Sequence, residues 1–232
     1  MPAPDMMRRC LLVLLPILIL TMPPTEPALA QSPERIELPE PDRAGSIPLE
    51  RMLDRRRSVR TYADAPLTLQ EVSQLLWAAQ GITHPSGYRT APSAGALYPL
   101  DLYLTGGRVT DLPDGVYHYR PRGHVLVRTE SADRRADLAA AALNQSWVRT
   151  GAVVIAIAGV YERSTQKYGD RGRRYTHIEV GHAAQNLYLQ AEALDLGTVI
   201  VGAFNDEKVR RALGLSDRER PLALLPVGRP RP

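Results

Sequence analysis

The sequence predicts an α+β fold with a central, mostly antiparallel sheet flanked by helices. Segments with helical spacing of apolar residues alternate with short apolar runs typical of strands, and two of those runs flank a tight turn. No regular strand–helix–strand repeat is present, which argues against a parallel sheet. The chain has 232 residues, of which 44% are hydrophobic and 23% charged. This is the composition of one globular domain of moderate size.

The first thirty residues have the features of a secretory signal peptide. Arg8 and Arg9 precede the apolar run CLLVLLPILIL, and an A-x-A cleavage site ends at Ala30. The run is short and interrupted by Pro16, so we expect cleavage after Ala30 and export, to the periplasm, without stable membrane insertion. The two arginines loosely fit a twin-arginine signal, but the very apolar run favours general secretion. The predicted segments are a signal peptide over 1–30, a Pro-rich extended leader over 31–48 and one domain over 49–232.

Cysteine and histidine usage narrows the possible chemistry. Cys10 is the only cysteine and lies in the predicted signal peptide, so we expect no disulfide and no thiolate nucleophile in the mature protein. Among the five histidines, only His177 and His182 are close in sequence, and a spacing of five does not suit a shared helix face, so we expect no metal site. The net charge of +4 is spread along the chain without a nucleic-acid-binding motif, so nucleic acid is not an expected partner.

The first half of the domain contains two predicted helices and three predicted strands. A helix is expected over about 49–57. The next begins at a capping box, with Thr68 as the N-cap and Glu71 three residues later, and ends at Gly81. After a loop rich in glycine and proline, strands are expected over 100–105, 115–120 and 124–128, the last two forming a hairpin.

The second half begins with a helix over about 133–144 and a continuous apolar strand over 152–160. Because this strand has no polar face, we expect helices to bury it on both sides. A polar loop containing Lys167 and Tyr168 then leads to a long helix over about 176–194, which ends before Gly197. The remaining predicted elements are a strand over 198–202, a helix over 205–215 and a strand over 222–228.

Four segments concentrate residues with chemical potential. Residues 55–62, RRRSVRTY, offer arginine forks and a hydroxyl, which are the groups that bind phosphate. Residues 89–99, RTAPSAGALYP, are small enough for a flat ligand to lie against backbone amides. The lysine ammonium of Lys167 beside the phenol of Tyr168 can hold or pass a proton. Glycine-containing strand ends at 202–205 and 228–231 complete the set.

Taken in order, these segments resemble the FMN-dependent nitroreductase superfamily. The likeness is greatest to its azoline-dehydrogenase branch, the SagB/ThcOx type, which oxidises thiazoline and oxazoline rings in modified peptides. It covers about residues 49–231 and implies a nitroreductase-like fold and a homodimer with the flavin site between two subunits. The strings that carry it are RRSVRTY (56–62), TAPSAGALYPLDLYL (90–104), GVYHY (115–119), KYGDRGRRY (167–175), EVGHAAQNLYL (179–189) and PVGRP (226–230).

The resemblance also implies roles for individual residues. Lys167 and Tyr168 match the Lys–Tyr pair implicated in proton abstraction in the azoline dehydrogenases, and we take them as the candidate catalytic residues. The implied FMN-binding residues are Arg56, Arg57 and Ser58 at the phosphate and ribityl end, Arg60 near the N1/O2 edge, Pro92, Ser93, Ala94 and Gly95 along the ring, Gly202 and Ala203 near N5, and Arg229 or Arg231 returning to the phosphate.

The long helix adds its own argument for a dimer. Its apolar residues extend over several faces, more than one core would bury, so we expect a partner subunit to cover part of the helix. The residues concerned are Ile178, Ala183, Ala184, Leu187, Tyr188 and Ala191.

The function expected from the resemblance is an exported FMN-dependent oxidoreductase with two half-reactions at one flavin. A small molecule or peptide, with NAD(P)H as one candidate, would donate or accept the electrons. We expect no peptide-recognition domain, and Ala96 stands where many nitroreductases have asparagine. One alternative is an exported flavin-binding protein without turnover. Another is a serine acylase, because residues 164–167 spell S-x-x-K, although its S-D-N and K-T-G partners are absent.

Overall fold

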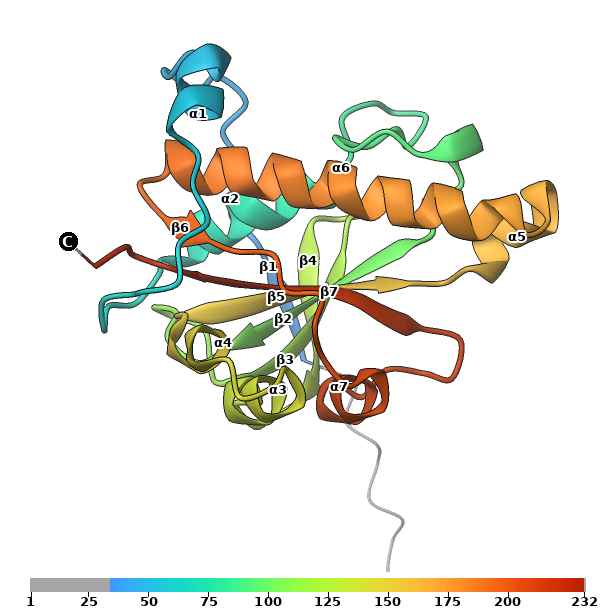
Figure 1. Cartoon of the computed structure of the whole chain (residues 1–232). Helices are drawn as coiled ribbons and strands as arrows, with labels where there is room; N and C mark the ends of the chain where they lie inside the picture. Colours follow the sequence, from blue (N-terminus) through green and yellow to red (C-terminus); the bar gives the residue numbers. More distant parts are fainter. Residues whose placement is uncertain (1–33, 232) are drawn as a thin grey trace, which may run out of the picture. The chain divides into compact units, whose positions relative to one another are not determined.

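A computed structural model describes residues 34–231 and shows the predicted α+β fold, built on one seven-stranded sheet (Figure 1). The strand order is β1-β4-β3-β2-β5-β7-β6, and each neighbouring pair is antiparallel. The strands are β1 (Arg35–Glu37), β2 (Leu100–Gly106), β3 (Gly115–Arg120), β4 (Val125–Glu130), β5 (Val153–Gly159), β6 (Gly197–Thr198) and β7 (Arg220–Gly228).

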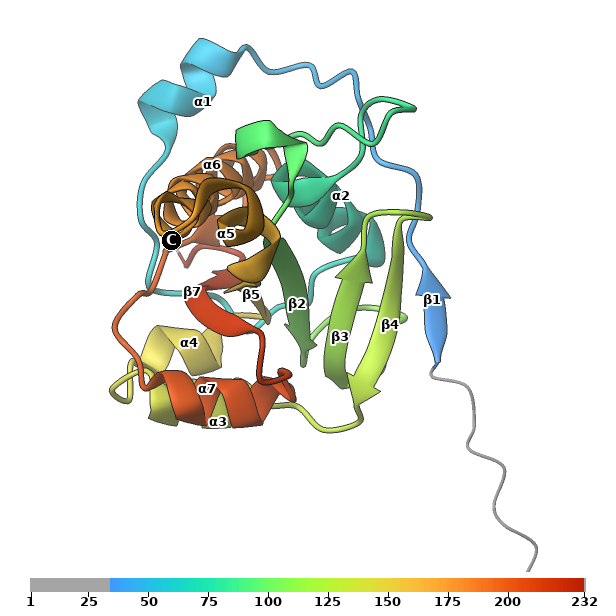
Figure 2. The same cartoon turned by 90° about the vertical axis from the view of Figure 1, so that its right-hand side faces the viewer.

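Helices cover both faces of this sheet. Helices α2 (Leu69–Gln80) and α6 (Arg171–Ala193) pack together over one face, while α3 (Arg135–Ala141), α4 (Ser146–Thr150) and α7 (Asp206–Leu213) cover the other (Figures 1 and 2). Strand β5 lies between β2 and β7, and every one of its residues is buried, as its continuous apolar sequence predicted. Each large aliphatic side chain buried in this way stabilises the fold by roughly 1.5–3 kcal/mol.

The start of α2 confirms the predicted capping box. The Glu71 backbone N–H donates to the Thr68 hydroxyl at 3.2 Å, and the Thr68 backbone N–H donates to the Glu71 carboxylate at 2.7 Å. Two N–H groups that the first helical turn leaves unpaired are thereby satisfied. The helix ends before Gly81, also as predicted.

The polar segment around Lys167 and Tyr168 is helical, in contrast to the predicted loop. These residues form the last turn of α5 (Glu162–Tyr168), and α6 starts at Arg171, before the predicted start near Thr176. Gly169, with φ of 58°, lets the chain turn from one helix to the next. The sequence concealed these turns because most of their side chains face solvent and produce no apolar periodicity.

Burial of α6 also corrects the sequence argument for a dimer. Five of the six apolar residues named in that argument are buried within the chain itself, because α6 packs against both α2 and the sheet. They are Ala183, Ala184, Leu187, Tyr188 and Ala191. Ile178 alone among the six is exposed, at 50%.

Other boundaries differ from the prediction. The helix expected over 133–144 ends at Ala141, because Leu143 and Asn144 adopt positive φ angles before α4 begins. The strand expected over 198–202 is shortened to β6. No helix in the described part of the chain is long and apolar enough to cross a membrane, and the predicted signal peptide lies outside that part.

Residues 34–48 are integrated into the domain, whereas the sequence suggested a separate leader. Strand β1 pairs with β4, with Ile36 opposite Leu126, and the buried Leu38 joins the core. The segment is then anchored by His124, whose backbone carbonyl accepts a hydrogen bond from the Leu38 N–H at 3.1 Å. The remaining link, helix α1 (Leu49–Arg55), leads from this segment to the arginine-rich residues.

The His124 side chain lies in a chain of hydrogen bonds beneath this segment. The Ser73 hydroxyl donates to the Pro39 carbonyl and therefore accepts from His124 Nε2–H, at 2.6 Å. The Tyr119 hydroxyl, 2.9 Å away, then donates to His124 Nδ1. This arrangement uses the neutral imidazole, and burial lowers the pKa of His124 below 6.5 although a hydrogen bond at Pro39 opposes the effect.

We therefore expect protonation of His124 to destabilise the protein. Between the folded and the unfolded pKa the unfolded chain binds more protons, so stability is complete above about pH 7 and falls as the pH drops through about 6.5. His124→Asn, which tolerates the positive φ of 50° at this position, should show a smaller decrease in melting temperature between about pH 8 and 5. His84→Asn, at an exposed position, is the control and should retain the wild-type pH dependence; an equal dependence in both variants would contradict the assignment.

Candidate functional site

The arginine-rich segment after α1 is held against β6 and the C-terminal half of α6. The Val59 N–H donates to the Thr198 carbonyl at 2.9 Å. The Ser58 hydroxyl lies 3.2 Å from the hydroxyl of Tyr188 on α6, and the Arg56 guanidinium lies over the Tyr188 ring, 5.2 Å from its centre. Residues that are 130 positions apart in the sequence therefore form one polar group of Arg56, Ser58 and Tyr188. We call these three residues, together with Arg60 two positions after Ser58, the arginine cluster.

The charges of this cluster are not neutralised within the described chain. Among residues 34–231, Arg56, Arg57 and Arg60 have no carboxylate within ion-pair distance, although Arg55 pairs with Glu192 at 3.0 Å. Arg60 lies over the Trp147 ring at 5.8 Å, and Arg57 donates to backbone carbonyls within its own segment. Uncompensated guanidinium groups beside a hydroxyl are suited to bind a phosphate.

The end of the chain after β7 returns to the arginine-rich segment. The guanidinium groups of its two arginines, Arg229 and Arg231, have different surroundings. The Arg229 carbonyl accepts from the Ala63 N–H at 2.9 Å, and the Arg231 N–H donates to the Thr61 carbonyl at 3.2 Å. The Arg229 guanidinium is already paired with Glu71 at 2.9 Å. A phosphate contact from Arg229 would have to share or break that ion pair, whereas Arg231 is exposed.

Gly202 and Ala203 lie on an exposed stretch after β6. A Cβ atom placed on Gly202 would meet no atom within 4 Å, so the surface in front of this backbone is open. The stretch begins near the arginine cluster, since the Ile200 N–H donates to the Tyr188 hydroxyl at 2.8 Å. The Ala203 carbonyl accepts from Gln145 Nε2 at 3.2 Å. An open backbone next to the arginine cluster is compatible with a flat ligand.

The small-residue loop and the Lys–Tyr pair meet at a second location. A Cβ atom on Gly95, whose φ is 64°, would lie 2.5 Å from the Tyr168 hydroxyl and 3.0 Å from Lys167 Nζ. Lys167 Nζ lies 5.3 Å from the centre of the Tyr168 ring, which packs edge-to-face on Tyr175. The loop at 92–95 and α5 are therefore in direct contact, and the missing side chain at Gly95 leaves room for both polar groups.

Sequence reasoning assigned no role to two α6 residues that hold this loop. His182 was expected to pack within the fold, yet it is exposed and lies with Nδ1 3.2 Å from the Pro92 carbonyl. Glu179 is 2% exposed, and burial raises the pKa of its carboxyl although hydrogen bonds from Ser93 and Gln80 oppose the rise. The string EVGHAAQN contained both residues, but nothing in its spacing showed which loop they would contact.

The two clusters occupy different parts of α6. Tyr188 belongs to the arginine cluster, and Glu179 and His182 support the loop beside Lys167 and Tyr168. At about 1.5 Å per residue, the nine positions from Glu179 to Tyr188 correspond to roughly 14 Å along the axis. The residues of α6 that contact the arginine-rich segment and those that contact the small-residue loop are therefore more than two turns apart.

The serine acylase suggested by the S-x-x-K string requires an accessible serine, and Ser164 is not accessible. Ser164, its required nucleophile, is 1% exposed in the α5–α6 contact, where Gly172 packs against the Ser164 backbone. A serine nucleophile must reach a substrate carbonyl, so this arrangement excludes acyl transfer by Ser164. Among the described residues no group of three histidine, cysteine or carboxylate side chains could hold a metal ion.

Comparison with known proteins places these features in a family context. The sequence profile of the nitroreductase family matches residues 53–229. A Methanocaldococcus jannaschii protein named as a nitroreductase is 49% identical over 194 residues, which is 84% of this chain and 96% of that protein. The crystal structure of a Ralstonia eutropha protein described as a nitroreductase has a TM-score of 0.76 and 30% identity, covering 89% of this chain and 94% of the other. The microcin B17-processing protein McbC of Escherichia coli is 27% identical over 163 residues, 66% of this chain and 58% of McbC.

Proposed function

This chain belongs to the nitroreductase family, and on that premise we propose that it is an oxidoreductase that uses non-covalently bound FMN. The observation that carries the proposal is the arginine cluster, in which Arg56 and Arg60 have no carboxylate partner among the described residues and Ser58 stands between them in the sequence. The nitroreductase-family assignment made from the sequence motifs is confirmed. The relative McbC is named as a microcin-processing protein, which agrees with the likeness to enzymes that act on modified peptides.

The residues present fit FMN. A phosphate at the arginine cluster would be neutralised by Arg56 and Arg60 and hydrogen-bonded by Ser58, with Arg57 and Arg231 as further exposed cations. The open backbone at Gly202 leaves space for a planar ring. When bound, FMN would accept a hydride from one substrate and pass it to another.

The Lys–Tyr pair supports proton-coupled chemistry. Lys167 and Tyr168 lie side by side at the end of α5, and both lie against Gly95. An ammonium and a phenol in contact can hold a proton and give it to, or take it from, a substrate atom. The proposed substrates are quinones, nitroarenes or azoline rings, with NAD(P)H as a candidate electron donor. A flavin-binding protein without turnover is the second candidate, and activity assays distinguish the two.

We further propose that two chains form a two-fold symmetric dimer with a shared flavin site. The arginine cluster includes Tyr188 of α6, whereas the Lys–Tyr pair is at the end of α5, beside the loop that Glu179 and His182 of α6 contact. A two-fold axis would bring the arginine cluster of one chain toward the Lys–Tyr pair of its partner. Leu49 and Leu53, one turn apart on α1, are 58% and 53% exposed, and Ile178 is 50% exposed. Exposed apolar side chains of this kind are typical of an interface between subunits.

Light scattering of the flavin-bound protein should therefore give the mass of two chains. Leu49→Gln combined with Leu53→Gln should shift the protein toward single chains and reduce its flavin content together, because the two properties share one interface. Leu143→Gln changes a 72% exposed leucine elsewhere and should alter neither the mass of the assembly nor its flavin content. A single chain that carries a full complement of flavin would overturn the dimer proposal.

If the arginine cluster binds the phosphate of FMN, replacing its arginines should remove the yellow colour of the protein. Arg56→Ala combined with Arg60→Ala removes charge-assisted hydrogen bonds worth roughly 1.5–3 kcal/mol each, so the double variant should purify without the yellow absorbance of FMN. Arg35→Ala combined with Arg122→Ala removes the same charge from exposed positions elsewhere and should remain yellow. A double variant at 56 and 60 that is as yellow as the wild type would show that the phosphate binds elsewhere.

The Lys–Tyr pair predicts a separation of binding from turnover. Lys167→Ala and Tyr168→Phe should retain the full flavin absorbance and slow steady-state turnover of a proton-coupled substrate by about 10²–10⁴-fold, the usual contribution of a general acid or base. Tyr175→Phe keeps the ring that packs on Tyr168 and should turn over at the wild-type rate. If the Lys167 and Tyr168 variants match the wild type on quinone, nitroarene and azoline substrates alike, the pair is structural.

A further inference from the structure

A pocket lies beside α5, and Gly95 is not among the residues that line it. Its volume is about 450 Å³, and it is bounded by α5, by the ends of β2 and β3 and by the turn that precedes β7. Arg163 and Gln166 of α5 line it, whereas the next residues, Lys167 and Tyr168, reach Gly95. No part of the proposed flavin chemistry uses this pocket.

The floor of the pocket is polar where a sheet face is normally apolar. Tyr103 on β2 pairs with His118 on β3, and their rings stack with centres 4.6 Å apart. Asp101, two residues before Tyr103, lies on the same face. Neighbouring positions on this face, such as Val116 and Val154, belong to an apolar cluster. Sequences that break the apolar pattern of a buried face commonly do so at functional sites.

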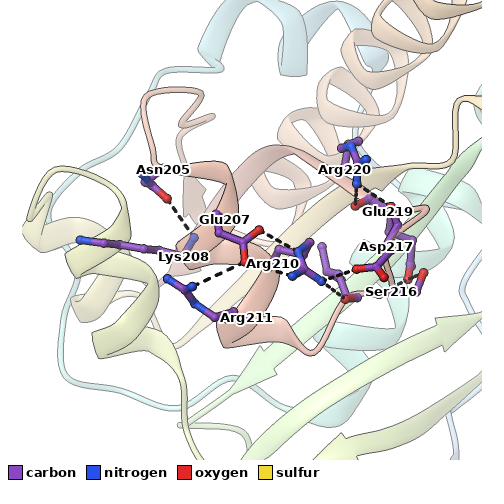
Figure 3. Close-up of polar contacts among 10 residues, drawn as sticks. Asn205, Glu207, Lys208, Arg210, Arg211, Ser216, Asp217, Glu219 and Arg220 are labelled. Atoms are coloured by element: carbon purple, nitrogen blue, oxygen red, sulfur yellow. Dashed lines mark hydrogen bonds and ion pairs between the residues drawn. The ribbon is translucent and has the colours of Figure 1, made fainter.

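Glu219 is a buried carboxylate without a cationic partner. It is 8% exposed, and none of the cations of residues 34–231 lies within ion-pair distance of it. Its oxygens accept from the Tyr103 hydroxyl at 2.6 Å and from the Ser216 N–H and hydroxyl at 2.9 and 2.7 Å. Figure 3 shows Ser216 and Glu219 in the turn between α7 and β7. Three neutral donors orient the carboxylate and leave its charge uncompensated.

The turn that carries Glu219 is itself held firmly. Arg210 of α7 donates to the Leu215 carbonyl at 3.2 Å and to the Asp217 carboxylate at 3.1 Å, and it also pairs with Glu207 (Figure 3). Arg220 donates to the Asp217 carbonyl at 2.7 Å. The position of the carboxylate is thus determined before any ligand arrives, which lowers the entropic cost of binding.

Asp101 and His118 complete the inner part of the pocket. Burial alone would raise the pKa of Asp101, but the neighbouring His118 and Arg163 outweigh it and lower the pKa to about 2, so the carboxylate is charged at neutral pH. Arg163 binds it with two hydrogen bonds of 3.0 and 2.7 Å. His118 is 8% exposed and makes no hydrogen bond within the described chain, its Nε2 being 3.8 Å from Asp101.

The outer part of the pocket is positively charged. Arg120 and Arg218 are exposed and, within residues 34–231, make neither an ion pair nor a side-chain hydrogen bond. The lining carries three carboxylates and three guanidinium groups in all, so a ligand of single charge is not favoured. The buried unpaired charge is that of Glu219, which is negative. The exposed unpaired charges are those of Arg120, Arg218 and Glu162, with a positive excess, and this separation gives the pocket a direction. A ligand with charges of both signs would match it.

We propose that this pocket binds a small zwitterion of the α-amino-acid type, with its ammonium group inward at Glu219 and His118 and its carboxylate outward at Arg120 and Arg218. An ammonium has three N–H donors, and the Glu219 carboxylate and an imidazole nitrogen of His118 can accept from it. The rim guanidinium groups match a carboxylate with paired N–H donors. A metal ion does not fit, since no metal-binding group exists among the described residues. The proposal does not depend on the oxidoreductase assignment.

Calorimetric titration of the whole protein with the natural amino acids tests the proposal. At least one should bind, and its two truncated analogues provide matched probes: for valine, isobutylamine lacks the carboxylate and isovalerate lacks the ammonium. We expect each analogue to bind at least about tenfold more weakly, because each loses charge-assisted hydrogen bonds. Isobutylamine binding as tightly as valine would show that the rim arginines take no part and would overturn the proposal.

Variants then locate the site. Glu219→Gln keeps the shape of the side chain and removes its charge, and Arg218→Gln changes an exposed residue, so it tests the pocket even if Glu219→Gln impairs folding. Each should weaken binding at least about tenfold, whereas Arg122→Gln, on the exposed turn after β3, should bind as the wild type does. Wild-type affinity in both pocket variants, or no heat from any amino acid up to about 10 mM, would overturn the proposal.

Discussion

The packing of α6 against α2 and the sheet is the constraint on which the candidate site depends. Ala183, Leu187 and Ala191 enter the core on one side of this helix, which fixes the direction of its other side chains. Glu179 and His182 are thereby directed to the loop at Pro92–Gly95, and Tyr188 to the arginine-rich segment. A helix of 23 residues is rigid over this span, so the two clusters are held at a defined separation.

Ion pairing distinguishes arginines that stabilise the fold from arginines available to a ligand. Arg55 is paired with Glu192, and Arg229 with Glu71, each joining an element to a helix that packs on the sheet. Arg56 and Arg60 are equally close to these elements but have no carboxylate among the described residues. Unpaired cations that repel one another reduce stability slightly, which is the pattern expected where an anionic ligand supplies the missing charge.

The short helix α5 connects the two places where polar groups gather. Arg163 and Gln166 face the pocket beside Glu219, while Lys167 and Tyr168 face Gly95. The buried Ser164 fixes the rotation of the helix by packing against Gly172 of α6. A rigid-body displacement of α5 would therefore move both sets of residues, because they belong to one short helix.

Local sequence patterns determined the fold class, the capped helix α2, the buried strand β5 and the order of the family motifs, because each depends on periodicity or on residues close in the chain. Tertiary structure alone decided which distant groups meet. The contact of Gly95 with Tyr168, the pairing of Arg229 with Glu71 and the entry of residues 35–37 into the sheet join segments more than 70 residues apart. It also decided that α6 is buried by its own chain and that α5 is a helix. Such contacts follow from how the layers pack, and a one-dimensional pattern holds no information on packing between layers.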